Sequence, residues 1–218
     1  MLKHVTCYVL LSLFQGYLFT SREDIIAEFQ PLLTERANNF TIEFNTASTD
    51  YPEVVDKIKN ETWTAVAALN NQIATLKTTI STDIAAATES DVINCLSGQQ
   101  TAANELSSDA INSTCWVGVT YPDLESARDA LGILAQIPNN TIDACASLNP
   151  LPSQDQQFVN CISHKILDLD LMNDVLVGNF TEVKEQTLNS STACLAEQTG
   201  VLSQQINDIN FQVTLCMS

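Results

Sequence analysis

Basic residues are scarce in this chain: nine Lys and Arg stand against 26 Asp and Glu, giving a formal net charge of −17. A surface with so few cations repels polyanions, so the composition argues against nucleic acid and anionic lipid as partners. No block of five like charges occurs, so the acidity is spread along the chain. We interpret it as a means of solubility in an extracellular fluid, in preference to an acidic recognition patch.

Glycine and proline are also rare, with six of each, and they cluster at breaks in the pattern. Between the breaks, apolar residues recur at intervals of three and four, and the alternation typical of strands is nearly absent. The sequence therefore predicts an all-α protein, an antiparallel multi-helix bundle that contains one long amphipathic helix.

Residues that would support catalysis or metal binding are equally few. Beyond the N-terminal segment the chain has one histidine, His164, with Asp168 one helical turn away, and no nucleophile-elbow sequence accompanies them. The segment Asp168–Asp174 begins like a calcium loop but lacks the central glycine and has Asn179 at the twelfth position. Zinc, phosphate-loop and dinucleotide motifs are missing. We expect a non-enzymatic protein with no cofactor or metal, and an exposed histidine on a helix.

Residues 1–21 have the composition of a secretory leader. Lys3 and His4 precede an apolar run that includes residues 9–14, and Thr20-Ser21 offers a small-residue exit. The run is shorter than the roughly 20 residues that a membrane span needs, and no later stretch is apolar enough. We expect cleavage of a signal peptide over 1–21, then an arm or helix over 22–50 and a disulfide-stabilised helical domain over 51–218, in an extracellular protein.

The cysteines beyond the leader are arranged almost symmetrically about one point. Cys7 leaves with the leader, and the remaining six form pairs centred on residues 153, 154.5 and 155.5, just after Pro150-Leu151-Pro152-Ser153, the strongest turn signal in the chain. A chain folded back there as two antiparallel helical arms predicts a nested disulfide ladder. Its pairs are Cys95–Cys216, Cys115–Cys194 and Cys145–Cys161.

Other connectivities remain open among the fifteen that six cysteines allow. Two of the possible pairs are disfavoured, because cysteines about 20 residues apart on one continuous helix would lie about 30 Å from each other. These are Cys95–Cys115 and Cys194–Cys216.

A helical stripe extends from Val55 to Ala87, for more than four heptads. It predicts a helix from about Glu53 to Glu89, with Pro52 in its first turn and Thr49 or Asp50 as a cap. The stripe lies outside the cysteine frame, so it either packs onto the bundle or pairs with another copy as a coiled coil.

The later segments repeat the helical pattern. Stripes occur over 91–115 and from Leu124 as far as Pro138, followed by a short helix over 141–147 that leads to the central turn. Beyond the turn one stripe covers 158–183, and a regular heptad pattern covers 195–216.

Six N-glycosylation sequons follow the leader, at Asn39, Asn60, Asn112, Asn139, Asn179 and Asn189. This is about twice the number expected by accident from the composition, so we predict that several carry glycan. Asn139, in a polar break after Pro138, is the best candidate, whereas Asn179 beside the stripe residue Phe180 is expected to be partly buried.

Two amphipathic segments are framed by cysteines in the same way: Cys95-Leu96 and Cys194-Leu195 open them, and Cys115 and Cys216 close them. This placement resembles that of the insect TsetseEP-domain proteins. The resemblance covers roughly residues 90–216, and the Glu-Pro repeat that named the family is missing. It implies an extracellular insect protein of no established activity, sometimes associated with gut or immune responses, and no catalytic residue can be transferred from it.

Three hypotheses about function follow. The first is a secreted, N-glycosylated, non-enzymatic protein with a binding or structural role, whose partner is an unknown protein or carbohydrate. The second is an extracellular carrier of small hydrophobic ligands, in which stripe residues line a pocket. The third is self-association through the long helix as a homo-oligomer.

Overall fold

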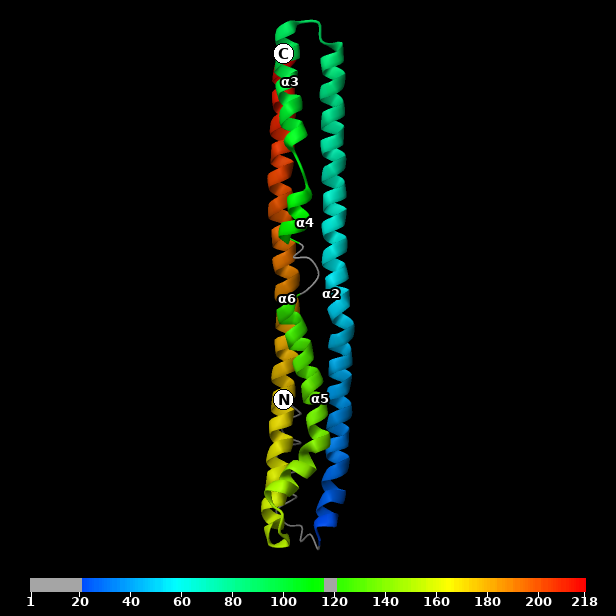
Figure 1. The fold of residues 1–218 in the computed structure, drawn as a ribbon, viewed down its shortest axis with the longest axis vertical. Helices are drawn as coiled ribbons and strands as arrows, with labels where there is room; N and C mark the ends of the chain where they lie inside the picture. Colours follow the sequence, from blue (N-terminus) through cyan, green and yellow to red (C-terminus); the bar gives the residue numbers. More distant parts are fainter. Residues whose placement is uncertain (1–20, 116–120) are drawn as a thin grey trace. The chain divides into compact units, whose positions relative to one another are not determined.

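The computed structural model describes residues 21–115 and 121–218. These residues form five α-helices and one short 3-10 turn, with no strand among them, which confirms the all-α prediction (Figure 1). The predicted leader, apart from Ser21, and Cys7 lie outside the described residues. The elements are α2 (Arg22–Ala86), α3 (Ser90–Glu105), α4 (Asp109–Cys115), α5 (Pro122–Leu148), η1 (Pro152–Gln154) and α6 (Asp155–Cys216).

The chain divides into two compact units. Unit 1 combines the residues up to Tyr51 with Pro122–Lys184, and unit 2 combines Pro52–Tyr121 with Glu185–Ser218. The division expected from sequence, with one disulfide-stabilised helical domain over 51–218, stays a prediction. The long helices α2 and α6 each contribute their first part to unit 1 and their second part to unit 2.

In unit 1, α2 and α6 run in the same direction. Three ion pairs join them, and the partners are separated by 133, 134 and 134 residues, so each step along α2 matches an equal step along α6. Only parallel neighbours keep such a constant offset. The pairs, with their N–O distances, are Arg22–Asp155 at 2.7 Å, Arg36–Asp170 at 2.8 Å and Lys184–Asp50 at 2.6 Å.

The core of unit 1 combines aromatic and aliphatic side chains from α2, α5 and α6. Gly132 in α5 lets the Phe44 ring of α2 come close, because a Cβ at that glycine would lie 2.9 Å from the ring. The buried members of this core are Ile25, Phe29, Leu33, Phe40, Leu134, Ala135, Ile142, Cys145, Phe158, Val159, Ile162, Ile166 and Leu169.

Unit 2 has an aliphatic core. Its helices are the second part of α2, the two short helices α3 and α4, and the last part of α6. The stripe predicted from Val55 to Ala87 is buried here against the rest of the chain, so it packs within the bundle. The buried members are Leu69, Ile73, Leu76, Ile80, Leu96, Ala103, Ile111, Leu202, Ile206 and Val213.

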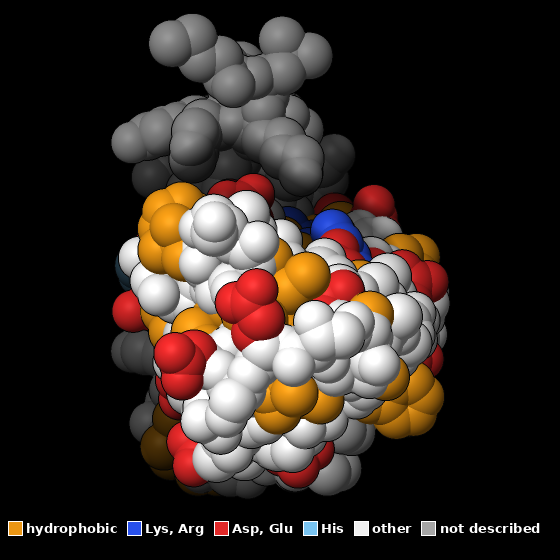
Figure 2. Space-filling model, turned by 90° about the horizontal axis from the view of Figure 1, so that it is seen from above, with side chains coloured by type: hydrophobic (Ala, Val, Ile, Leu, Met, Phe, Trp, Pro, Cys, Tyr) orange, Lys and Arg blue, Asp and Glu red, His pale blue; other side chains and the backbone are white. Residues whose placement is uncertain are grey.

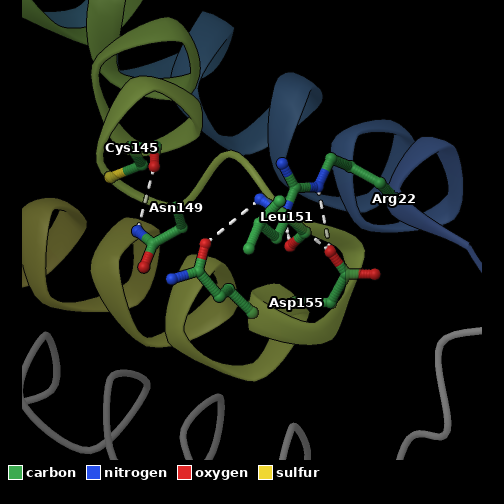
Figure 3. A network of polar contacts seen from close by, with 6 residues as sticks. Arg22, Cys145, Asn149, Leu151 and Asp155 are labelled. Atoms are coloured by element: carbon green, nitrogen blue, oxygen red, sulfur yellow. Dashed lines mark hydrogen bonds and ion pairs between the residues drawn. The ribbon is translucent and has the colours of Figure 1, made fainter.

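The predicted turn lies between α5 and α6, and side chains fasten it from two directions (Figure 3). Arg22, at the start of α2, donates from Nε and Nη2 to Asp155 Oδ1 and from Nη2 to the carbonyl of Leu151. The backbone N–H of Leu151 donates to Gln154 Oε1. The Arg22 guanidinium also lies 4.7 Å from the centre of the Phe158 ring. The turn is therefore held to α2 as well as to its own helices.

Helix α2 begins at Arg22, far before the predicted start near Glu53, so residues 22–50 are helical. Pro52 lies inside the helix, with no cap at Thr49 or Asp50. Thr49 Oγ1 donates to the carbonyl of Asn45 instead, and Asp50 pairs with Lys184. The physical reason is packing: the buried positions of α2 continue on both sides of the proline, at Phe40, Ala47, Val54 and Ile58. This burial outweighs the cost of an interior proline.

Two other helix boundaries differ from the prediction. Helix α5 continues through Pro138, whose ring is fully buried, so the predicted break and the separate short helix over 141–147 are wrong. Conversely, the segment 91–115 is interrupted after Glu105, where Leu106 has extended backbone and Ser108 Oγ donates to Asn70 Oδ1 on α2. Helix α6 joins the two C-terminal stripes into one element.

Candidate functional surface

All six cysteines of the described residues form disulfides that join neighbouring helices. Each bridge ties α6 to an antiparallel helix, and the Cα–Cα distances lie in the usual range for a disulfide. These are the pairs that the symmetry about the turn predicts. They are Cys95 of α3 with Cys216 at 5.7 Å, Cys115 of α4 with Cys194 at 5.5 Å, and Cys145 of α5 with Cys161 at 5.8 Å.

The six sequon asparagines all lie on helices, and their exposure differs. Five are exposed, namely Asn39, Asn60, Asn139, Asn179 and Asn189. Asn139 is exposed on α5 rather than in a loop. Asn179 is also exposed, although the next residue, Phe180, is only 5% exposed. Asn112 is half-buried on α4, and its Oδ1 is buried with no hydrogen-bond partner. Sequence patterns could not distinguish Asn112 from the others.

The residues considered for catalysis or calcium all lie on α6, but they do not share one exposed face. His164 and Asp168 are exposed, and Asp170 is bound to Arg36. The described residues contain no group of three or more His, Cys, Asp or Glu side chains that could hold a metal ion. Within the same part of the chain, no helix combines the length and the apolar character that crossing a membrane requires.

A surface groove in unit 2 lies between α2 and α6. Its volume is about 380 Å³, close to the lower limit of small-molecule sites. Buried Leu76 and Ile206 contribute apolar surface to it. Amide and hydroxyl side chains complete the lining, at Asn71, Gln72, Thr75, Thr79, Asn207 and Asn210.

The groove lining contains no charged side chain, in contrast to the strongly acidic chain around it. Asn and Gln carboxamides both donate and accept hydrogen bonds, which matches neutral ligands that bear hydroxyl or amide groups. The groove depends on the pairing of α2 with α6, since it combines residues that are far apart in the sequence. Sequence analysis missed it because amide-rich stretches occur throughout this chain.

Unit 2 is unusual in its charge distribution. Residues 78–121 and 185–218 contain no Lys or Arg. In the view of Figure 2, polar side chains and backbone predominate, acidic groups are scattered among them and basic groups are few. Hydrophobic side chains form separate small groups in the same view. The lining of the groove is itself uncharged, and most of the unit around it has no basic residue.

Two groups of large apolar side chains are exposed on α6. The first, which we name the Leu171 patch, comprises Leu171, Met172 and Val175, which are 65%, 45% and 61% exposed. The second, the Phe211 patch, comprises Phe211 and Leu215, one helical turn apart and 61% and 51% exposed. Exposed apolar side chains that lie together on one helix face commonly mark contact surfaces.

Comparison with protein-family models, with curated proteins and with solved structures finds no match to this chain.

Proposed function

We propose that this is a secreted, N-glycosylated, non-enzymatic helical protein that acts by binding a neutral partner in an extracellular fluid. The observation that carries the proposal is the neutral groove between α2 and α6. Six uncharged polar side chains and two apolar ones line it, on a chain whose net charge is −17. The resemblance to the TsetseEP-domain proteins adds an insect gut or immune setting to the proposal.

An extracellular location is supported by the disulfides. Three bridges consume six cysteines and join α6 to three other helices, and such bridges persist in oxidising compartments. The five exposed sequon asparagines are accessible acceptors for a glycan. The compartment and the modification support each other, because N-glycans are added in the secretory pathway.

The ligand class follows from the groove lining. Carboxamides and hydroxyls hydrogen-bond to sugar hydroxyls, while Leu76 and Ile206 can contact the C–H faces of a sugar ring. A neutral oligosaccharide is therefore the partner that the groove fits best. A strongly apolar ligand would leave the amides without hydrogen-bond partners, which costs free energy. The lining therefore favours an oligosaccharide over an apolar cargo.

Expression of the full chain in a eukaryotic secretory cell tests location and modification. We expect protein in the medium, an intact mass above that of the polypeptide, and a loss of that extra mass after enzymatic removal of N-glycans. Retention of an unmodified chain inside the cell would contradict this part of the proposal.

Binding to a panel of immobilised neutral oligosaccharides tests the groove. The double variant Asn207→Ala/Asn210→Ala should lose the binding, because two hydrogen-bonding side chains are removed from the lining. Asn104→Ala is the matched control, since Asn104 is exposed on α3 of the same unit and lies outside the groove. Equal binding by the wild-type protein, the double variant and the control would show that the groove does not recognise neutral sugars. The absence of binding by the wild-type protein would show the same.

A further inference from the structure

The Leu171 patch and the acceptor Asn179 lie on the same outer face of α6. At 100° per residue, Leu171, Met172, Val175 and Asn179 all fall within about a third of the helix circumference. The core positions Ile166, Leu169 and Phe180 occupy the other side and are at most 8% exposed. The patch and the acceptor thus share a face that points away from the core of unit 1.

The distances along this face are short. Val175 and Asn179 are four residues apart, so their Cβ atoms lie about 5–6 Å from each other. Leu171 lies one turn further, about 12 Å along the axis from Asn179. A glycan attached at Asn179 can cover this length with its first few sugar residues.

The surface between the acceptor and the patch is open, and the exposed carboxylate of Asp174 lies at its edge, one helical turn from Leu171 and from Gly178. Gly178 precedes Asn179, and a Cβ built there would meet nothing within 4 Å, so no neighbouring side chain fills the space. The next residues outward on the face in each direction are charged, Asp168 on one side and Glu182 on the other. Charged side chains therefore border this apolar face at both ends and, through Asp174, along one edge.

We propose that the N-glycan at Asn179 folds onto the Leu171 patch and covers it. The contacting groups are the C–H faces and acetamide methyls of the core N-acetylglucosamine residues, which are apolar, while the sugar hydroxyls face water. The glycan thereby turns an exposed apolar face into a hydrated one. This inference rests on the proposed secretion and glycosylation, and it assigns one acceptor a specific role.

The Phe211 patch offers an internal contrast on the same helix. No sequon follows Asn189, and Asn189 itself lies about six helical turns before Phe211. A glycan therefore has no attachment point beside Phe211 and Leu215. Removal of a glycan should therefore make the Leu171 patch more accessible and leave the accessibility of the Phe211 patch unchanged. This difference distinguishes local covering from a general effect of glycans on solubility.

The experiment uses the full glycosylated chain with Asn179→Gln, and with Thr181→Ala as a second variant that keeps the asparagine. Binding of a hydrophobic fluorescent dye should rise roughly twofold or more in both, because the patch becomes accessible. Asn189→Gln is the matched control. It removes a glycan from an exposed acceptor on α6 whose neighbours one turn away, Glu185, Gln186, Thr192 and Ala193, are not large apolar residues.

A further substitution identifies the covered surface. Leu171→Gln/Val175→Gln should leave dye binding unchanged while the glycan is present and should abolish the rise in Asn179→Gln. Phe211→Gln should lower dye binding of the glycosylated protein. A glycan on Asn179 whose removal leaves dye binding unchanged would overturn the inference, as would an unmodified Asn179 in a chain that is glycosylated elsewhere. A chain with no glycan at any sequon would overturn the proposed function itself.

Discussion

The two units build the same three-part arrangement in different ways. In unit 1 the helix that runs opposite to α2 and α6 is α5, one element of 27 residues. In unit 2 that place is taken by α3 and α4, which have 16 and 7 residues. One disulfide lies in unit 1 and two lie in unit 2, one on each short helix. The three α2–α6 ion pairs all lie in unit 1.

This difference shows where the chain needs covalent support. Isolated helices shorter than about 12–15 residues are marginal in water, so α4 is far below the length that persists alone. Its last residue, Cys115, is bridged to α6. Helix α5 instead buries nine residues along its length, and its one bridge lies next to the turn. Disulfides thus support the short helices α3 and α4, whereas packing along nine buried positions stabilises the continuous helix α5.

Removing the bridge of α4 tests this contrast most strongly. Cys115→Ala/Cys194→Ala opens a closed loop of 79 residues, which the loop-entropy model values at about 4.5 kcal/mol of unfolding free energy. We expect a loss of this order in urea unfolding. Hydrogen exchange should also show α4 unprotected, because so short a helix does not persist without its bridge.

The bridge of unit 1 is the matched control. Cys145→Ala/Cys161→Ala opens a loop of 16 residues and should cost about 3 kcal/mol on the same model. Hydrogen exchange should respond differently to this loss, because α5 stays packed and its amides stay protected. Equal protection of α4 and α5 after loss of their bridges would show that the disulfides do not compensate for short helices.

The aromatic core of unit 1 provides the next comparison. Phe158 is 0% exposed and lies under Arg22, so Phe158→Ala should lower the unfolding free energy by about 3–5 kcal/mol. Leu96 is equally buried in unit 2, and Leu96→Ala should cost about 2–5 kcal/mol. Chemical denaturation of both variants measures the difference. A smaller cost for Phe158→Ala would mean that the turn and its ion pair relax around the cavity.

The helical class, the central turn and the disulfide pairs could be predicted from sequence, because apolar spacing and cysteine symmetry are local or nearly local signals. The course of α2 through Pro52 and of α5 through Pro138 could not. Proline penalises a helix by a known local amount, whereas the compensating burial depends on which helices pack together. The interruption at Leu106 was missed for the converse reason, since the apolar stripe continues across it.

The candidate surface could likewise be predicted from sequence only in part. Sequence motifs identify every cysteine and sequon, but they do not show that Asn179 is exposed and that Asn112 is half-buried. The groove requires the parallel pairing of α2 with α6. The stripe of α2 is compatible with several neighbours, so the constant offset between α2 and α6 emerges only from the folded chain.

Proline replacement tests whether packing really outweighs local preference in α2. Pro52 is an exposed interior residue, so Pro52→Ala should restore a helical hydrogen bond and raise the unfolding free energy by about 2 kcal/mol, after allowing for the greater flexibility of the unfolded chain. Pro138→Ala should raise the unfolding free energy by less, because the buried ring of Pro138 makes core contacts that alanine would lose. Thermal unfolding of both variants gives the comparison. An equal gain at the two sites would show that the buried ring contributes little.

The smallest expected effect concerns the ion pairs of unit 1. Arg36 donates to both oxygens of Asp170 at 2.9 and 2.8 Å, and the two side chains are 17% and 40% exposed. A double-mutant cycle with Arg36→Ala and Asp170→Ala should give a coupling of about 0.5–1 kcal/mol that falls with added salt, because water and ions screen a partly exposed pair. Exchanging the two residues, as Arg36→Asp/Asp170→Arg, should recover part of the coupling if the parallel register brings these positions together. If the original pair shows no coupling, apolar packing alone determines that α2 and α6 run parallel. The constant offset between the ion-pair partners would then result from the packing of the core, and the ion pairs would not help to set it.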